Sequence, residues 1–317
     1  MYKILPHKIE KGLTDINGCL VDYVQNVLDK NSSLFQPDLR SHFYDLDALT
    51  GGFAPANLIA IASRPGMGKS SFALTIAANA ARYSNKSVAF FSLNRSREKL
   101  VQQLIFQETS VEVARITTCK ITEKENQQLI KAITRYKSLP LFICDAPNIT
   151  VEGIRTEIIG LQNHLKQKEL GLIVIDCLQL INENSCIHST EQLSKIVRKL
   201  KQLAKEFNVP ILMLSEINRS VDTRINKRPR LTDLSDCGSL EDIADLVLMI
   251  YRESYYSLDE SELEIAELII TKHRLGAKGT IKLLYDPSLN VFRNLKTLTR
   301  LGTNVTTKLT TSQPLPV

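Results

Sequence analysis

Residues 58–71 read Leu58-Ile59-Ala60-Ile61-Ala62-Ser63-Arg64-Pro65-Gly66-Met67-Gly68-Lys69-Ser70-Ser71. The apolar start predicts a strand, the glycines predict a tight loop, and a helix is expected to open at Lys69. Gly66 and Gly68 let backbone N–H groups turn inward because no Cβ stands in the way. The dipole of the following helix adds to these groups. A strand, a glycine loop and a helix in this order therefore predict a cradle for phosphate.

Lys69 and Ser70 give this cradle the chemistry of a nucleotide site, because such a lysine reaches the β- and γ-phosphates and the hydroxyl ligates Mg²⁺. The usual pattern GxxxxGK[ST] opens with a glycine, and Ser63 stands there in this chain. ATP and Mg²⁺ are the cofactors that the pattern indicates. The residues expected to line the site are Ser63, Arg64, Pro65, Gly66, Met67, Gly68, Lys69, Ser70 and Ser71.

Asp176 supports the nucleotide site, since it ends the apolar run Leu172–Ile175. A carboxylate at the end of a parallel strand emerges beside a phosphate loop, where it holds Mg²⁺, usually through water. Ser70 and Asp176 are therefore the predicted metal ligands.

The rest of the chain predicts an α/β fold. Early strands alternate with helices, which indicates a mostly parallel twisted sheet flanked by helices. Later strands follow one another closely, so antiparallel strands are expected toward the C-terminus. The clearest helix spans Glu191–Phe207, with its apolar residues at helical spacing. The expected strands are Leu58–Ala62, Val88–Ser92, Leu141–Cys144, Leu172–Asp176, Ile211–Ser215, Leu246–Tyr251, Ile265–Thr271 and Ile281–Tyr285.

The composition excludes several classes of protein. The chain has 317 residues, is 43% hydrophobic and 23% charged, as is ordinary for globular proteins. No apolar run reaches membrane-spanning length, and the first residues lack the apolar stretch of a secretory signal. The six cysteines form no CxxC pair, which predicts neither a zinc knuckle nor a disulfide framework and favours a reducing compartment. Cys144 and Cys177 are expected to be buried apolar residues.

The net charge of +6 is concentrated in one segment, because Lys195–Arg230 carries ten Lys and Arg against three acidic residues. A basic run alone is typical of a solvated helix face.

Three parts of the chain are expected. Residues 1–41 include a linker-like amphipathic helix at Asp15–Lys30, which either folds back on its own domain or docks on a neighbouring subunit. Residues 42–295 form the main domain. Residues 296–317, rich in threonine and ending in prolines, are expected to be disordered.

Further stretches in a collinear order carry a family resemblance. They are Asp45-Leu46-Asp47, Thr50-Gly51-Gly52, Phe91-Ser92-Leu93, Val174-Ile175-Asp176-Cys177-Leu178-Gln179-Leu180, Asn208-Val209-Pro210, Lys227-Arg228-Pro229, Asp233-Leu234 and Lys272-His273-Arg274-Leu275-Gly276. With Arg64–Lys69, they resemble the C-terminal, RecA-like ATPase domain of DnaB-type replicative DNA helicases, from about Asp45 to Phe292. On this resemblance, this sequence is expected to carry only the linker-like helix of that family's N-terminal part.

The resemblance implies an ATP-dependent helicase of the primosome, with a RecA-like P-loop NTPase fold, a hexameric ring, ATP between subunits and single-stranded DNA in the channel. Lys272 and Arg274 match a piston lysine and an arginine finger that reach the neighbour's ATP. The implied partners include a primase or a helicase loader, and no membrane. The implied location is the cytoplasm, or the plastid stroma for an organelle-encoded chain. The residues implied to serve DNA contact are Arg219, Arg224, Lys227, Arg228, Arg230, Asp236 and Gly238.

Three residues depart from the family pattern. Asn94 stands where the family has a catalytic glutamate, Glu216 where it usually has a glutamine that senses the γ-phosphate, and Ser235 where it has an arginine of the channel loop. One hypothesis is that acid and amide have exchanged places, so that Glu216 supplies the carboxylate and Asn94 orients the attacking water. The alternative is drift in a lineage with slow or no hydrolysis.

Three functions compete at this point. The first is a helicase motor that hydrolyses ATP, translocates on single-stranded DNA and unwinds duplex DNA. The second is a hydrolysis-impaired, ATP-binding DNA scaffold or loader partner of the same fold, which Asn94 favours and Lys69, Asp176, Lys272 and Arg274 oppose. The third is a RecA-like recombination factor, although Lys227–Asp233 and Lys272–Arg274 are more similar to the helicases.

Overall fold

The protein is described from a computed structural model, which divides into residues 1–37 and residues 38–317. The described residues are 39–84, 86–111, 120–165, 169–182, 189–257 and 263–295, with the isolated residues 16, 115 and 118. Most of the N-terminal helix expected at 15–30 and the tail expected at 296–317 lie outside them. Within the described part, no helix has both the length and the apolar character that a bilayer crossing requires.

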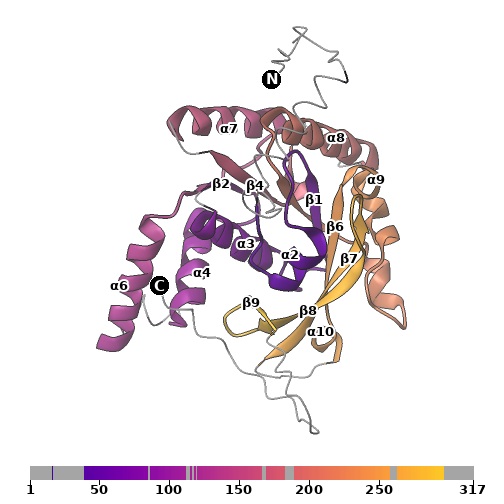
Figure 1. The fold of residues 1–317 in the computed structure, drawn as a ribbon. Helices are drawn as coiled ribbons and strands as arrows, with labels where there is room; N and C mark the ends of the chain where they lie inside the picture. The colour runs from indigo at the N-terminus through magenta and orange to yellow at the C-terminus, as the bar shows by residue number, and fades with distance from the viewer. Residues whose placement is uncertain are drawn as a thin grey trace, which may run out of the picture. The chain divides into compact units, whose positions relative to one another are not determined.

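A nine-stranded mixed sheet forms the centre of the larger unit (Figure 1). Its strand order is β3-β2-β4-β5-β1-β6-β7-β8-β9. The first six strands in this order run parallel, and the last three are added antiparallel. The strands are β1 Leu58–Ser63, β2 Ser87–Ser92, β3 Leu141–Cys144, β4 Leu170–Asp176, β5 Ile211–Glu216, β6 Leu246–Arg252, β7 Glu264–His273, β8 Gly279–Asp286 and β9 Val291–Asn294.

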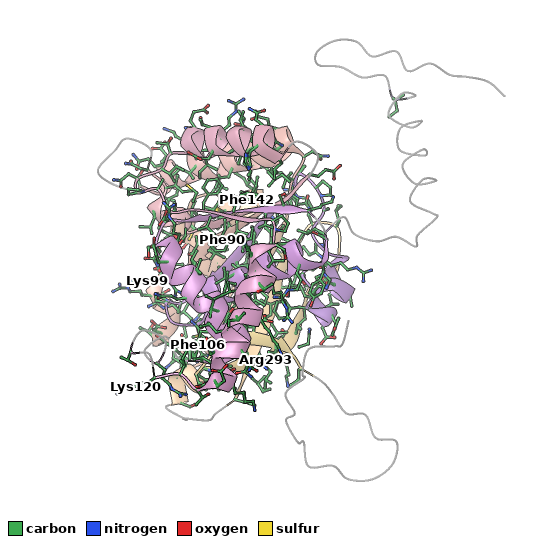
Figure 2. The ribbon with its side chains drawn as sticks, turned by 90° about the vertical axis from the view of Figure 1, so that its left-hand side faces the viewer. Phe90, Lys99, Phe106, Lys120, Phe142 and Arg293 are labelled. Carbon is green, nitrogen blue, oxygen red and sulfur yellow. The ribbon has the colours of Figure 1, made fainter. Side chains whose placement is uncertain are left out.

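Helices cover both faces of this sheet. Alternate residues of a strand point to opposite faces, and β1 accordingly sends Ile59 and Ile61 into one apolar cluster and Leu58, Ala60 and Ala62 into the other. Helices α3 (Lys69–Tyr83) and α4 (Arg97–Thr109) close the first cluster, and α7 (Val151–Leu165) and α8 (Thr190–Phe207) close the second. Figure 2 shows the labelled Phe90 and Phe142 on the strands between these helical layers.

The remaining helices of the described residues are short or peripheral. They are α2 Tyr44–Thr50, α6 Glu123–Lys137, α9 Leu240–Ile243, α10 Ser254–Ser257 and the 3₁₀ turns η1 Leu178–Leu180, η2 Arg219–Thr223 and η3 Leu231–Cys237. Local signals fix several ends. Ser189 and Gln192 form a capping box at the start of α8, and Asn208, at φ 53°, ends it, as short polar residues in the left-handed region do.

The structure confirms the mostly parallel sheet, the antiparallel strands toward the C-terminus, all eight expected strands and the helix at 190–207. Two expectations need correction. Strand β9 was not expected, because it has only four residues. Only Val291 and Phe292 of these are buried, which is too short an apolar pattern to indicate a strand. Cys144 is half-buried, because β3 lies at the sheet edge and all four of its residues keep some exposure. Cys177 is buried as expected.

Candidate functional site

The phosphate loop connects the end of β1 to the start of α3, as the sequence predicts. Gly66 has φ 79° and Gly68 has φ 96°, which is the left-handed region that glycine tolerates best. Gly68 is the residue that precedes the first turn of α3, so the free N–H groups of that turn face the loop. The loop is further held by Arg252, which donates from Nη1 to the Gly66 carbonyl at 3.0 Å.

Gly68 is also required by space. A Cβ at this position would lie 2.8 Å from the Phe292 ring. The unexpected strand β9 therefore lies directly beside the loop and fixes how closely side chains approach it. Arg252, Tyr255 and Phe292 are neighbours of the site that local patterns offered no means to identify, because they follow the loop by more than 180 residues.

Lys69 is nearly enclosed, with 9% of its surface exposed. Its Nζ donates to the Ser63 carbonyl at 3.3 Å. Burial lowers the pKa of Lys69, and this is opposed first by the charge of Glu216 and then by Cys177 and Asp176. A buried ammonium with one long hydrogen bond retains donors for an anionic ligand.

Asp176 ends β4 and is 2% exposed. Its Oδ2 atom is buried without a hydrogen-bond partner. Burial raises the pKa of Asp176, while the hydrogen-bonding Ser70 side chain and the charges of Arg95 and Lys69 oppose this rise. A buried carboxylate oxygen without a partner is costly unless something occupies it, and a hard cation does so. The pair Ser70 and Asp176 therefore fits Mg²⁺.

Glu216 is the last residue of β5, and Asn94 follows the end of β2 by two residues. Glu216 lies opposite Ser63 in the register of β1 and β5. Its side chain is exposed, and of the neighbouring charges it acts most strongly on Lys69. The backbone N–H of Leu93 donates to the Asp176 carbonyl at 2.7 Å, and Ser92 pairs with Asp176, so Asn94 follows two residues beyond the level of the predicted metal ligand. The ends of four parallel strands thus bring together the predicted lysine, metal ligands, acid and amide.

Ser71 has another role than the one expected from the loop pattern. Its hydroxyl donates to the Asn290 carbonyl and accepts from Gln103 at 2.8 Å and Gln107 at 3.1 Å. These contacts join α3 to α4 and to the turn between β8 and β9. The Ser71 side chain therefore stabilises the helix start that follows the loop, through its contacts with α4 and with the turn between β8 and β9.

Lys272 and Arg274 lie away from the phosphate loop of their own chain. Because β7 runs antiparallel to β6, Lys272 pairs with Val247 near the start of β6, and β6 begins opposite Ile59. The phosphate loop follows Ser63 at the other end of β1. Val247 pairs with Ala60, three residues before Ser63, so at about 3.3 Å per residue Lys272 lies roughly 10 Å along the strands from the start of the loop.

Contacts within the chain hold Lys272 and Arg274 at this end of the strands. Lys272 Nζ donates to the carbonyls of Glu241 and Asp242, each at 2.7 Å. Arg274 Nη1 lies 3.3 Å from Asp245 Oδ1, and the Arg274 side chain is 52% exposed. Next to it, Leu275 is 89% exposed. The loop that carries Arg274 and Leu275 is therefore open to solvent.

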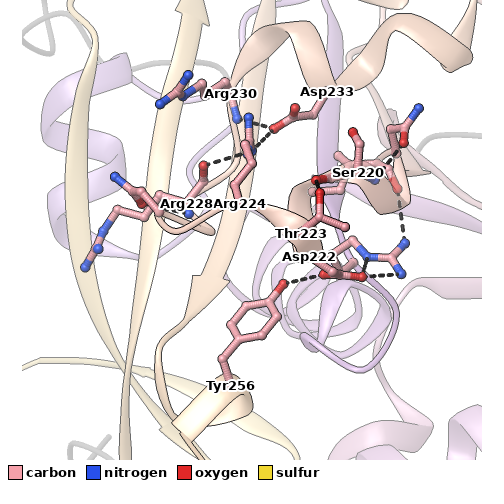
Figure 3. Close-up of polar contacts among 12 residues, drawn as sticks. Ser220, Asp222, Thr223, Arg224, Arg228, Arg230, Asp233 and Tyr256 are labelled. Atoms are coloured by element: carbon pink, nitrogen blue, oxygen red, sulfur yellow. Dashed lines mark hydrogen bonds and ion pairs between the residues drawn. The ribbon is translucent and has the colours of Figure 1, made fainter.

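The basic segment Arg219–Arg230 divides into paired and unpaired cations (Figure 3). Arg224 forms an ion pair with the buried Asp233 at 2.7 Å, and Arg228 pairs with Glu267 at 2.8 Å. Lys227 lies over the Tyr256 ring, 4.6 Å from its centroid. Arg219 and Arg230 are exposed, and no carboxylate among the described residues forms an ion pair with either. These two cations have the greatest freedom to meet a polyanion.

The remaining predicted DNA residues lie beside this segment. Asp236 accepts a hydrogen bond from the Asn218 side chain. Gly238, at φ 65°, approaches α8 so closely that a Cβ would lie 2.5 Å from the Ser194 nitrogen. Ser235, where an arginine was expected, adds no charge.

Comparison with known proteins identifies the family to which this chain is similar. The profile of the family described as "DnaB-like helicase C terminal domain" matches residues 38–294. A "Probable replicative DNA helicase" of Trieres chinensis is 42% identical over 268 residues, which are 83% of this chain and 58% of that protein. The "Replicative DNA helicase DnaB" of Geobacillus stearothermophilus is 39% identical over 289 residues, which are 90% of this chain and 62% of that protein. The chain thus spans about three-fifths of the length of these relatives.

Two solved structures share the fold. One is described as an "ATPase Domain", with a TM-score of 0.82 and 30% identity, covering 90% of this chain and all of that one. The other is "The Structure Of A DnaB-Like Replicative Helicase And Its Interactions With Primase", with a TM-score of 0.79 and 30% identity, covering 89% of this chain and 70% of that one.

Proposed function

The chain belongs to the family of DnaB-like helicase C-terminal domains, and from that premise we propose that it is the ATPase motor of a replicative DNA helicase. It hydrolyses ATP, moves along single-stranded DNA and opens duplex DNA during replication. The working form is a ring of identical subunits, six by the family resemblance. The proposed site of action is the compartment that replicates the DNA, the cytoplasm or the plastid stroma. A primase or a helicase loader is the proposed protein partner.

The observation that carries this proposal is the position of Arg274 and Lys272, which lie at the end of the strands opposite to the end that carries their own phosphate loop. In this position they are unable to complete the ATP site of their own chain. A head-to-tail contact between copies brings one subunit's edge to the next subunit's loop, and repetition of such a contact closes a ring. The exposed Leu275 beside Arg274 supplies apolar surface for the contact.

The pocket residues have distinct proposed roles in hydrolysis. Lys69 binds the β- and γ-phosphates, and Ser70 and Asp176 hold Mg²⁺, which neutralises phosphate charge when bound. A water oxygen attacks the γ-phosphorus, the bond from that phosphorus to the bridging oxygen breaks, and ADP leaves. Glu216 accepts the water proton, and Asn94 orients the water. Arg274 and Lys272 of the neighbour stabilise the charge on the transferring group, as an arginine finger does.

DNA contact is proposed for the basic segment in the ring channel. Cations that neutralise phosphates give binding that is independent of base sequence and weakens with salt. Arg219 and Arg230 are proposed as the direct contacts because they are exposed. Arg224 and Arg228 are proposed to shape the segment through their ion pairs with Asp233 and Glu267.

Subunit mixing tests whether the site is shared. Lys69→Ala and Arg274→Ala should each abolish turnover in a pure ring, since an arginine finger contributes about 10³–10⁵-fold. When the two variants are mixed before assembly, half of the subunits keep Lys69 and half of their neighbours keep Arg274. About a quarter of the interfaces are then complete in a heterologous ring. The ATPase rate of the mixture should therefore recover to about a quarter of the wild-type rate.

A matched mixture provides the control. Lys69→Ala mixed with the double variant Lys69→Ala/Arg274→Ala contains no complete interface and should stay inactive. The shared-site proposal is wrong if the first mixture stays inactive while the wild-type protein turns over, or if pure Arg274→Ala keeps its rate.

Asn94 favours a second candidate, a scaffold that binds ATP and DNA without hydrolysis. The amide has no proton-accepting carboxylate, and a general base is worth about 10²–10⁴-fold. The two candidates differ in wild-type turnover with single-stranded DNA present. Measurable turnover supports the motor. Tight nucleotide binding without turnover, followed by a large gain in Asn94→Glu, supports the scaffold.

A further inference from the structure

An ion pair ties the phosphate loop to the basic segment. Arg64 directly follows β1, and Asp222 lies in η2 among the cations of the segment. Arg64 Nε donates to Asp222 Oδ2 at 3.0 Å, and Arg64 Nη2 lies 2.9 Å from the same atom. Arg64 Nη1 donates to the Ile217 carbonyl at 3.2 Å. The guanidinium thus contacts both the residue that follows β5 and a residue inside η2.

The second oxygen of Asp222 is also used. Tyr256 donates its hydroxyl to Asp222 Oδ1 at 2.9 Å (Figure 3). Tyr256 packs edge-to-face on Tyr255, with ring centroids 5.1 Å apart. The Tyr255 ring in turn lies 3.0 Å from the position that a Cβ on Gly66 would take. Asp222 is therefore connected to the phosphate loop twice, through Arg64 and through the two tyrosines.

The same tyrosine contacts the basic segment. Lys227 lies over the Tyr256 ring, so the tyrosine that hydrogen-bonds to Asp222 is also in contact with a cation of the basic segment. The Arg64 side chain is 12% exposed, and that of Asp222 is 38% exposed. A shielded guanidinium makes stronger polar contacts than one in open water, so movement of η2 carries a free-energy cost at the phosphate loop.

The geometry points to Asp222 as a positioning residue that couples the two ligand sites: we propose that the Arg64–Asp222 ion pair transmits occupation of the basic segment by single-stranded DNA to the phosphate loop. This inference rests on the proposed motor function. Asp222 itself touches neither ligand. It sets the position of Arg64 according to the position of η2.

Coupling between two binding sites is reciprocal. The effect of nucleotide on DNA affinity therefore reports the same coupling as the effect of DNA on nucleotide binding, and it is measured without ATP turnover. The dissociation constant of a fluorescein-labelled oligo(dT) is determined by anisotropy with and without a non-hydrolysable ATP analogue. In the wild-type protein the two constants should differ. The ratio of the larger constant to the smaller should fall by about fivefold or more in Asp222→Asn and so approach one. A change of this size lies within the usual range of allosteric coupling. The increase of ATPase kcat by oligo(dT) should fall in parallel, while kcat without DNA stays within about twofold of wild type.

Two further variants separate coupling from stability. Asp222→Glu keeps the charge and should keep the wild-type ratio. Asp233→Asn removes an ion pair with Arg224 inside the same segment without touching the phosphate loop, so it should lower the unfolding midpoint and change DNA affinity equally in both nucleotide states, which leaves the ratio unchanged.

The possible results are distinct. An unchanged ratio in Asp222→Asn overturns the inference, and so does an equal loss in Asp222→Asn and Asp233→Asn, which would mean general loosening of the segment. A wild-type protein with one DNA affinity in both nucleotide states and no DNA stimulation of its ATPase would instead remove the proposed motor function.

Discussion

Lys201 of α8 and Asp245, the residue before β6, form an ion pair of 2.5 Å with side chains only 16% and 8% exposed. Asp245 Oδ2 also accepts the backbone N–H of Leu58, the first residue of β1, at 2.8 Å. Asp245 Oδ1 faces Arg274. One carboxylate therefore joins α8, β1, β6 and the loop that carries the proposed finger.

Asp245→Ala should destabilise the fold by about 2–4 kcal/mol, because removing one partner leaves a shielded charge uncompensated. The measurement is the free energy of unfolding in urea. Glu206→Ala is the control, since its pair with Arg155 is exposed on both sides at 38% and 42% and should contribute less than about 1 kcal/mol. Equal losses of unfolding free energy in the two variants would show that the shielded contacts of Asp245 contribute no more to stability than the exposed ion pair.

Gly68→Ala should weaken the binding of a fluorescent ATP analogue by roughly tenfold or more, since a contact of 2.8 Å to Phe292 forces a shift that costs about 1–3 kcal/mol. Gly51→Ala is a matched control: Gly51 also has positive φ, at 74°, but a Cβ there meets nothing within 4 Å. It should lose about 1–2 kcal/mol of stability from strain alone and keep its nucleotide affinity. Unchanged affinity in Gly68→Ala would contradict the close approach of β9 to the loop.

Glu216→Gln should lower kcat by about 10²–10⁴-fold, the usual contribution of a general base, while affinity for the ATP analogue is kept. Glu157→Gln, an exposed residue in the middle of α7, should leave kcat unchanged. The double variant Asn94→Glu/Glu216→Gln should recover turnover if the two positions share the pocket. Full turnover in Glu216→Gln would end the role proposed for this carboxylate.

Arg219→Ala/Arg230→Ala should weaken oligo(dT) binding and reduce the slope of log affinity against log salt by about 1.4, because each phosphate contact to a single strand contributes about 0.7. Arg198→Ala removes an exposed charge from α8 and should leave the slope as it is. A slope that is the same in all three proteins would place DNA contact on another surface.

Much of the fold and of the nucleotide pocket follows from the sequence alone. The run 58–71 predicts a strand, a loop and a helix because its apolar residues, glycines and lysine act within a few residues of one another. Asp176 could be placed near that loop because parallel strands end at one edge of a sheet, and Glu216 was assigned to the site through the family resemblance. Short-range rules of this kind need no knowledge of distant contacts.

The tertiary structure decided what depends on residues far apart in the chain. No local pattern indicated that Phe292 lies against Gly68, that Arg64 pairs with Asp222, or that Ser71 faces Gln103, since these contacts need the whole sheet to form first. Residue type also left open which cations of the basic segment are paired. The sequence predicted antiparallel strands toward the C-terminus, but only the observed register of β7 on β6 placed Arg274 at the end of the strands away from Gly68, because the register depends on how the whole chain packs and not on residue type.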